Sequence, residues 1–217
     1  MKKIFISTLA ISSLLFTVGC KTDFDTDVRD VTVTKGEADF TRYVALGNSL
    51  TAGFRDNALY ADGQNESYPN IIAGQMKLAG GGAFKQPMIP NNIGGFTDKT
   101  NYPGKLTLQI INGSLAPVAS VAAAALDNVS SGAPYQNLGV PGAKSFHLGI
   151  SGYGALNPYY QRFAIGNNAS PIKDAVAQSP TFFSLWIGNN DVLSYATSGG
   201  VGVDQSAAGN INPATYG

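Results

Sequence analysis

The chain has 217 residues with 14 basic and 14 acidic side chains, so its formal net charge is zero. Charged residues make up only 13% of the sequence, and no basic cluster suggests nucleic-acid binding. With one cysteine, an internal disulfide is excluded, and the length suits one α/β domain or part of a larger one.

The N-terminus has the pattern of an export signal. Two lysines precede residues 4–18, whose apolar run is typical of a signal peptide and short for a membrane span. The only cysteine, Cys20, follows a glycine at the end of this run. The arrangement resembles a bacterial lipobox, although Thr17 stands where the lipobox prefers leucine. The resemblance implies cleavage after residues 1–19 and lipid attachment to Cys20. The alternative is a plain signal peptide with an incidental cysteine.

Residues 20–42 are rich in Asp and Thr and predict a lipid-anchored tether, with Val31–Val33 as its one candidate strand. The folded domain is expected to begin at Tyr43 with a short buried strand that breaks at Gly47. Ser49 follows on the turn into a helix. At the carboxyl end of a parallel strand, such a serine projects into the crevice where open α/β sheets bind ligands. Taken alone, the motif is equally typical of an ordinary turn.

The next segments alternate between helix and loop signals. Residues 59–65 are predicted as loop, and a helix is predicted to start around Ser67 and to end at a glycine triplet. Residues 83–133 are punctuated by Gly and Pro and predict an insertion that forms either a lid over the site or an elaborate surface loop. Within it, residues 106–111 alternate like a strand or hairpin arm, and the Ala-rich residues 115–126 suggest a helix.

The apolar residues of this insertion allow two interpretations. They line an acyl pocket, or they form a small core of the insertion's own, which is the favoured interpretation. These residues are Phe84, Met88, Ile89, Ile93 and Phe96.

Regular structure is expected again after the insertion. A short strand is predicted at Asn137–Gly139, and two helices are predicted to start at Pro158 and Pro171. Residues 181–187 are almost continuously apolar, as expected of a central parallel strand covered on both faces, and residues 191–197 predict a helix. Strands that alternate with helices predict an α/β fold with a parallel sheet.

Three motifs follow the predicted strands, namely Gly47–Leu50, Asn137–Gly139 and Gly188–Asp191. Because the carboxyl ends of parallel strands lie at one edge of a sheet, we expect these motifs to converge. Attack of a serine on an ester generates an oxyanion, which needs hydrogen-bond donors. Backbone N–H groups at the serine and at a glycine, with an asparagine side chain, are suitable donors.

Together these motifs resemble the SGNH hydrolases, the family of GDSL-like lipases and acylhydrolases, over residues 43–197. The resemblance implies that Ser49 is the nucleophile, that Gly139 is the second-block glycine and that Asn190 is the side-chain donor to the oxyanion. Asn48 departs from the Asp that the family usually has. The family implies a flavodoxin-like three-layer α/β/α sandwich and hydrolysis of carboxylic ester or related acyl bonds.

The family's C-terminal Asp-x-x-His motif, which supplies the general base, does not occur in this chain. The only histidine, His147, does not occupy the family's position, and its neighbours suggest a half-buried helix face. Because residues after 197 read as loop, we expect residues 43–217 to be the N-terminal part of a hydrolase domain, incomplete at its C-terminus.

The leading interpretation is a serine esterase anchored by lipid at Cys20 in the outer membrane of a Gram-negative envelope, acting on a small-molecule, lipid or glycan ester. The second is a non-catalytic envelope lipoprotein that binds lipid or glycan on the same fold. A purely structural lipoprotein is the third. No metal-ligand cluster, phosphate loop or dinucleotide motif occurs, so we expect no cofactor, no metal and no nucleic-acid partner.

Overall fold

The computed structural model describes residues 30–197 and residue 199. The predicted signal peptide and Cys20 lie outside the described residues. Residues 30–33 belong to an N-terminal unit separate from residues 34–217. They are exposed and form no strand, so the candidate strand at Val31–Val33 is wrong. Within the described ranges, no helix is long and apolar enough to cross a membrane.

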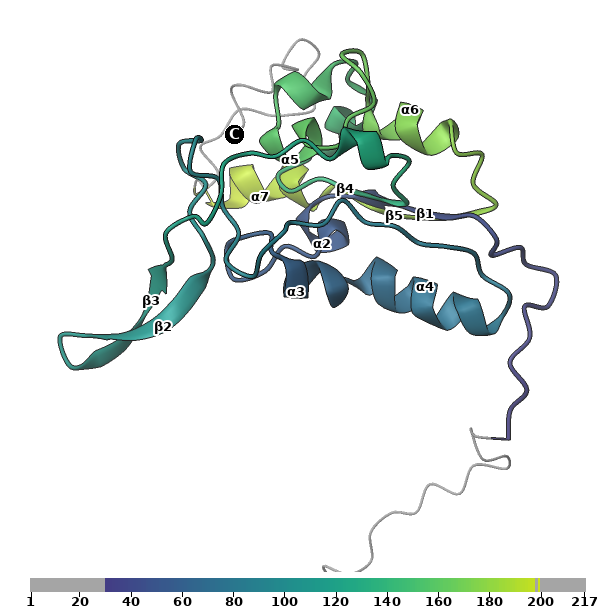
Figure 1. The fold of residues 1–217 in the computed structure, drawn as a ribbon, viewed down its shortest axis with the longest axis horizontal. Helices are drawn as coiled ribbons and strands as arrows, with labels where there is room; N and C mark the ends of the chain where they lie inside the picture. Colours follow the sequence, from purple (N-terminus) through teal and green to yellow (C-terminus); the bar gives the residue numbers. More distant parts are fainter. Residues whose placement is uncertain (1–29, 198, 200–217) are drawn as a thin grey trace, which may run out of the picture. The chain divides into compact units, whose positions relative to one another are not determined.

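A parallel three-stranded sheet forms the centre of the fold (Figure 1). Strand β1 (Tyr43–Gly47) lies between β4 (Asn137–Gly139) and β5 (Phe182–Trp186), and both pairings are parallel. Gly47 is in register with Gly139 on one side and with Trp186 on the other. The strand ends that carry the three motifs therefore lie side by side, and the predicted α/β class with a parallel sheet is confirmed.

Short helices connect and cover the strands. The α-helices are α2 (Ser49–Ala52), α3 (Ala61–Asn65), α4 (Tyr68–Leu78), α5 (Pro158–Gln161), α6 (Pro171–Val176) and α7 (Asn189–Thr197). The 3₁₀ turns are η1 (Ser130–Gly132), η2 (Ser145–Gly149) and η3 (Tyr153–Ala155). Helices α3 and α4 lie on one face of the sheet, and α5 and α6 lie on the other (Figure 1).

The predicted helix starts after Ser67, Asn157 and Ser170 are confirmed, each with proline in the first turn. The side chain of Asn157 accepts hydrogen bonds from two backbone N–H groups of α5, as an N-cap does. The predicted loop at residues 59–65 is wrong, because α3 forms there. Gln64 of this helix is buried and bonds to Pro87 O and Ile89 N, so contacts with a distant segment stabilise a helix that its sequence does not favour.

Strand β1 divides the core into two layers, because successive side chains of a strand point to opposite faces. Val44 packs into the larger cluster with Leu138 and Tyr160. Tyr43 and Ala45 point to the other face, where they pack against α4.

The insertion at residues 83–133 is part of this core. Ile89 and Phe96 are each 3% exposed and belong to the larger cluster, while Phe84 stacks on Tyr43 on the opposite face. The favoured interpretation, a small core of the insertion's own, is therefore wrong. The helix predicted at residues 115–126 is also wrong.

In its place the insertion forms an antiparallel hairpin. Strands β2 (Leu106–Ile111) and β3 (Ser114–Ala119) pair along their whole length. Asn112 and Gly113 connect them with φ angles of 51° and 80°. Two consecutive positive φ angles are typical of a type I′ turn, whose twist matches that of a hairpin.

A buried arginine fastens the insertion to the body of the fold. Arg162, just after α5, donates to Pro87 O at 2.9 Å and to Met88 O at 2.7 Å. Its guanidinium also pairs with both oxygens of Asp127 near the other end of the insertion. The Arg162 side chain is fully buried, and that of Asp127 is 32% exposed. The Arg162 side chain thus binds both ends of the insertion, and these contacts pair its charge and its hydrogen-bond donors.

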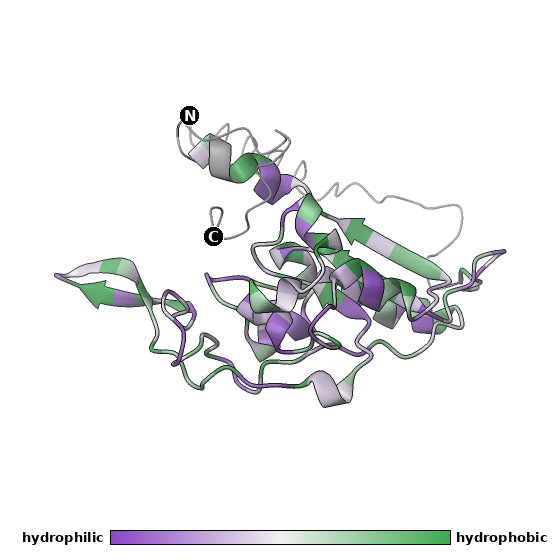
Figure 2. Ribbon diagram, turned by 90° about the horizontal axis from the view of Figure 1, so that it is seen from above, coloured by the Kyte–Doolittle hydropathy of each residue, from purple (hydrophilic) through white to green (hydrophobic). Residues whose placement is uncertain are grey.

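Strand β5 differs from its prediction as a central strand covered on both faces. Among the described residues it is an edge strand with β1 as its neighbour. Phe183, Leu185 and Trp186 are 61%, 53% and 50% exposed, and the hydrophobic colouring of this strand is visible in Figure 2. The prediction failed because an apolar sequence shows only that a strand can be buried. Whether it is buried depends on the elements that pack against it.

We predict that Asp127→Ala lowers the free energy of unfolding by about 3 kcal/mol, because it leaves the buried Arg162 charge without its partner. Chemical denaturation measures this change. The matched control is Glu66→Ala, which breaks an exposed ion pair with Arg55 and is expected to cost less than about 1 kcal/mol. Equal losses in the two variants would contradict the anchoring role of Arg162.

Candidate active site

Ser49 is the first residue of the single-turn helix α2, directly after β1. The turn requires glycine at position 47, because a Cβ there would lie 2.1 Å from Thr51 Oγ1 and 2.4 Å from Trp186 O. Gly53 ends the helix with a φ of 85°. Ser49 is partly exposed, and within the described residues its hydroxyl forms no hydrogen bond.

The residue before the serine is fully buried and bonds in two directions. Asn48 Oδ1 accepts from the backbone N–H of Leu50 at 3.1 Å and so caps α2. Asn48 Nδ2 donates to Asn189 Oδ1 at 2.5 Å. Since Asn189 begins α7, this side chain joins the turn after β1 to the turn after β5.

The chain after β4 makes a tight turn. Ala143 N donates to Val140 O at 3.0 Å, and Gly142 has a φ of 80°. Pro141 followed by a glycine with positive φ is typical of a type II turn. Val140 N donates to Gly47 O at 3.0 Å, which extends the pairing of β4 with β1 to the start of the Ser49 turn.

The predicted donor at Gly139 is occupied by an internal contact. Its backbone N–H donates to Asn137 Oδ1 at 3.0 Å, and a Cβ at this position would lie 2.3 Å from Ala52 N. Gly139 therefore allows α2 to pack closely on β4. By contrast, the N–H of Gly142 has no hydrogen-bond partner within the described part of the chain. The sequence analysis did not consider Gly142 as a candidate donor. The Pro-Gly pair, which is typical of a type II turn, was the signal that could have identified it.

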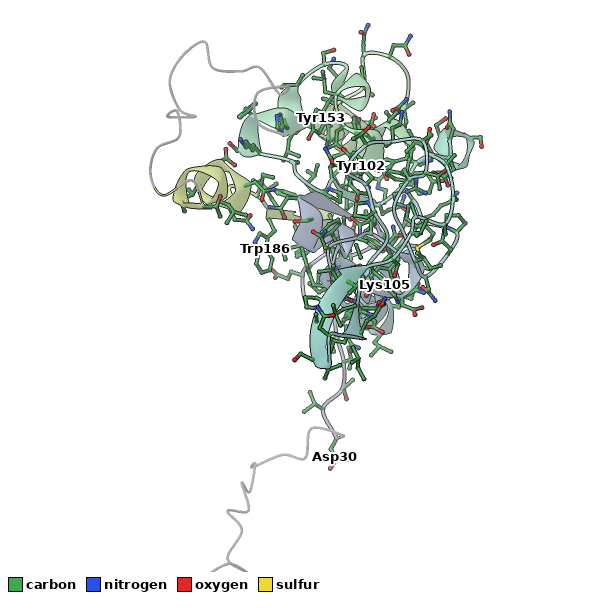
Figure 3. The ribbon with its side chains drawn as sticks, turned by 90° about the vertical axis from the view of Figure 1, so that its left-hand side faces the viewer. Asp30, Tyr102, Lys105, Tyr153 and Trp186 are labelled. Carbon is green, nitrogen blue, oxygen red and sulfur yellow. The ribbon has the colours of Figure 1, made fainter. Side chains whose placement is uncertain are left out.

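The turn after β5 is hydrogen-bonded to the chain after β4. Asn190 Nδ2 donates to Ala143 O at 2.9 Å. The carboxylate of Asp191 accepts from the backbone N–H of Ser145 at 2.9 Å and from its hydroxyl at 2.5 Å. All three motif turns are thus hydrogen-bonded at one edge of the sheet, and the elements carrying Ser49, Gly139 and Asn190 meet there. Figure 3 shows this side of the molecule, with Trp186 near the ends of the strands.

His147 is a buried structural residue on η2. It is 4% exposed, not half-buried, and stacks on Tyr153 with ring centroids 4.8 Å apart. Nδ1 accepts from Lys144 N at 3.0 Å, while Nε2 is buried without a partner within the described residues. Burial lowers the pKa of His147 to about 4, with the Lys144 charge acting in the same direction and Asp191 opposing it. The neutral imidazole makes no hydrogen bond to Ser49.

Across the described ranges, no group of three or more His, Cys, Asp or Glu side chains is arranged to hold a metal ion. The described site contains a serine, backbone N–H groups and amide side chains, with the Asp191 carboxylate bonded to Ser145. Such an arrangement is suited to binding negative charge on oxygen beside a nucleophile.

Comparisons with known proteins do not identify a family. No family model matches the chain, and neither the curated proteins nor the solved structures contain a match. The resemblance to SGNH hydrolases stays a prediction from three motifs.

We predict that the single imidazole in the chain titrates near pH 4 in the folded protein. Because the unfolded histidine titrates near 6.5, the unfolded state binds more protons between these values, and stability falls by up to about 3 kcal/mol as the pH drops from 6.5 to 4. The C2-proton resonance of His147 in an NMR titration measures this pKa. A midpoint near 6.5 would contradict the enclosed, neutral imidazole.

Proposed function

We propose that this chain carries the nucleophile and the oxyanion-binding groups of a serine hydrolase that cleaves carboxylic ester bonds, on a flavodoxin-like α/β/α fold of the SGNH type. The observation that carries the proposal is the hydrogen-bonded contact of three strand-end turns around Ser49. The Ser49 hydroxyl is partly exposed and makes no internal hydrogen bond among the described residues, as a nucleophile that awaits a substrate should.

In this proposal Ser49 Oγ attacks the acyl carbon, and the carbonyl oxygen becomes an oxyanion. The N–H groups of Ser49 and Gly142 stabilise that charge, with Gly142 in the place first assigned to Gly139. The third donor is the side-chain amide of Asn190, whose Nδ2 carries a second hydrogen besides the one bonded to Ala143 O. The rigid turns hold these donors before the reaction, so little reorganisation accompanies the charge. The collapse of the intermediate releases the alcohol and leaves an acyl group on Ser49, which water then removes.

The proton acceptor in this mechanism lies outside the described residues. His147 is unsuited to the role, because its Nδ1 is bonded to Lys144 N, its Nε2 is enclosed and its pKa is lowered. The proposal assigns the base to another part of the protein, and it places the enzyme in the outer membrane by a lipid on Cys20. Small-molecule, lipid and glycan esters are its candidate substrates.

One observation favours a second candidate function. Since no described residue hydrogen-bonds to Ser49 Oγ, the same site suits a lipoprotein that binds acyl or glycan groups without cleaving them. A binding protein of this kind would use the N–H groups at the sheet edge to hold a carbonyl or carboxylate oxygen.

We expect the chain to hydrolyse p-nitrophenyl acetate slowly, at about one ten-thousandth or less of the rate of a complete triad enzyme, in a reaction that depends on Ser49. Added imidazole should raise this rate, because it supplies a base that the described residues lack. The Ser49→Ala variant should show only the background hydrolysis by imidazole in solution.

The matched control is Ser114→Ala, which removes an exposed hydroxyl from the hairpin and should leave hydrolysis unchanged. If Ser49→Ala and the wild type hydrolyse the ester equally, with and without imidazole, the enzymatic proposal fails and the binding lipoprotein becomes the leading interpretation.

A further inference from the structure

The hairpin of the insertion exposes a continuous apolar face. Because directly paired residues of an antiparallel ladder share a face, the register places the apolar residues of both strands together. This face consists of Leu106, Leu108, Ile110, Leu115, Pro117 and Ala119. All are exposed, with Leu108, Ile110 and Leu115 at 70%, 74% and 70%.

The opposite face of the hairpin is of mixed character. It carries the polar Thr107, Gln109 and Ser114 beside Ile111, Ala116 and Val118, and three of its six positions are partly buried. A hairpin normally turns its apolar residues to the protein and its polar residues to water. Here the wholly apolar face is the more exposed one, and the hairpin extends away from the helices (Figures 1 and 2). An exposed apolar patch of this kind is typical of an interaction surface.

The hairpin is also joined to the segment that follows the candidate nucleophile. Leu106 N donates to Asp56 O at 2.7 Å, and Lys105 N donates to Ile93 O at 2.8 Å. Asp56 lies in the turn after α2. The hydrogen bond to Asp56 therefore ties the base of the hairpin to a residue seven positions after Ser49. Lys105 lies at the base of the hairpin in Figure 3.

The hairpin carries no charged side chain between Leu106 and Ala119. Lys105 precedes it, and Asp56, whose backbone oxygen accepts from Leu106 N, lies at the same end. Lys105 Nζ lies 4.4 Å from the ring centroid of Tyr60, which keeps the ammonium beside the base of the hairpin. Val121, just beyond β3, adds 87% exposed apolar surface. An uncharged apolar hairpin with a lysine at its base matches the interface of a lipid bilayer, where apolar side chains enter the acyl region and lysines stay among the headgroups.

We propose that the apolar face of the β2–β3 hairpin docks into a lipid bilayer, with Leu108, Ile110 and Leu115 entering the acyl-chain boundary. A second copy of the chain is a poorer occupant. The side chains of this face expose on the order of 400 Å² of accessible surface, taking about 100 Å² for each fully exposed large aliphatic side chain. A stable protein interface needs about 800 Å² on each partner. Insertion of a few apolar side chains into lipid does not require a minimum interface area of this kind.

The inference goes beyond ester hydrolysis and does not depend on it. Through the Leu106–Asp56 bond, docking of the hairpin would bring the sheet edge with Ser49 close to the lipid surface. A hydrolase would then meet esters in the membrane, and a binding protein would meet acyl chains there. Binding to vesicles is measured without any turnover, so failure of one proposal is distinguishable from failure of the other.

The test uses the full chain with Cys20→Ser, so that no lipid is attached, and vesicles of equal parts phosphatidylcholine and phosphatidylglycerol. Hydrogen–deuterium exchange of the hairpin amides and co-sedimentation are the readouts. We expect slower exchange in β2 and β3 when vesicles are added. Ile110→Ser should abolish that protection and weaken partitioning by about tenfold, because it removes one inserted side chain.

The control is Ile111→Ser, which changes the same residue type at the next position on the opposite face, where the side chain is 45% exposed. It should keep partitioning within about twofold of the parent. The N-terminal segment is identical in both variants, and exchange at the hairpin amides reports contact of the hairpin itself with lipid. Equal effects of the two substitutions, or no protection by vesicles, would overturn the proposal. So would a dimer in analytical ultracentrifugation that Ile110→Ser dissociates, since the face would then be a protein interface.

Discussion

The arrangement at the sheet edge depends on one buried amide. Asn48 is 0% exposed, yet its oxygen caps α2 and its nitrogen bonds to Asn189 at the start of α7. A buried polar group that loses a partner costs about 1–3 kcal/mol, so this position favours a side chain that can satisfy both contacts. Asn48 thereby fixes the Ser49 turn against the turn after β5. An Asp here, as is usual in SGNH hydrolases, would accept from an Asn189 amide turned by 180°, so this departure is compatible with the same geometry.

Close backbone packing is the second constraint. Gly47 and Gly139 stand where a Cβ would overlap Thr51 or Ala52, so the first helical turn lies directly on two strands. The insertion also stabilises this arrangement, because its residues Ile89 and Phe96 are part of the core beside β1. The turns that meet around Ser49 are therefore backed by tightly packed structure. Preorganised donors of this kind act on a developing charge without having to move first.

Local signals in the sequence predicted a large part of the fold. Asn157 and Ser170, each followed by proline, marked helix starts because a cap and a fixed φ act within a few residues. The features that were missed depend on distant partners. Gln64 stabilises α3 through Pro87 and Ile89, which no local pattern reveals. The sequence motifs pointed to the candidate site, but the choice between Gly139 and Gly142 as a candidate donor required the hydrogen bond to Asn137.

The most direct test of the account is the site of reaction with a fluorophosphonate, which phosphonylates activated serines. Peptide mass spectrometry of the treated chain locates every adduct. We expect slow but selective labelling, with the adduct on the peptide that contains Ser49, because the proposed oxyanion donors lie at that turn. Labelling spread over exposed serines, or its absence at Ser49, would contradict the claim that these three turns form a site for nucleophilic attack.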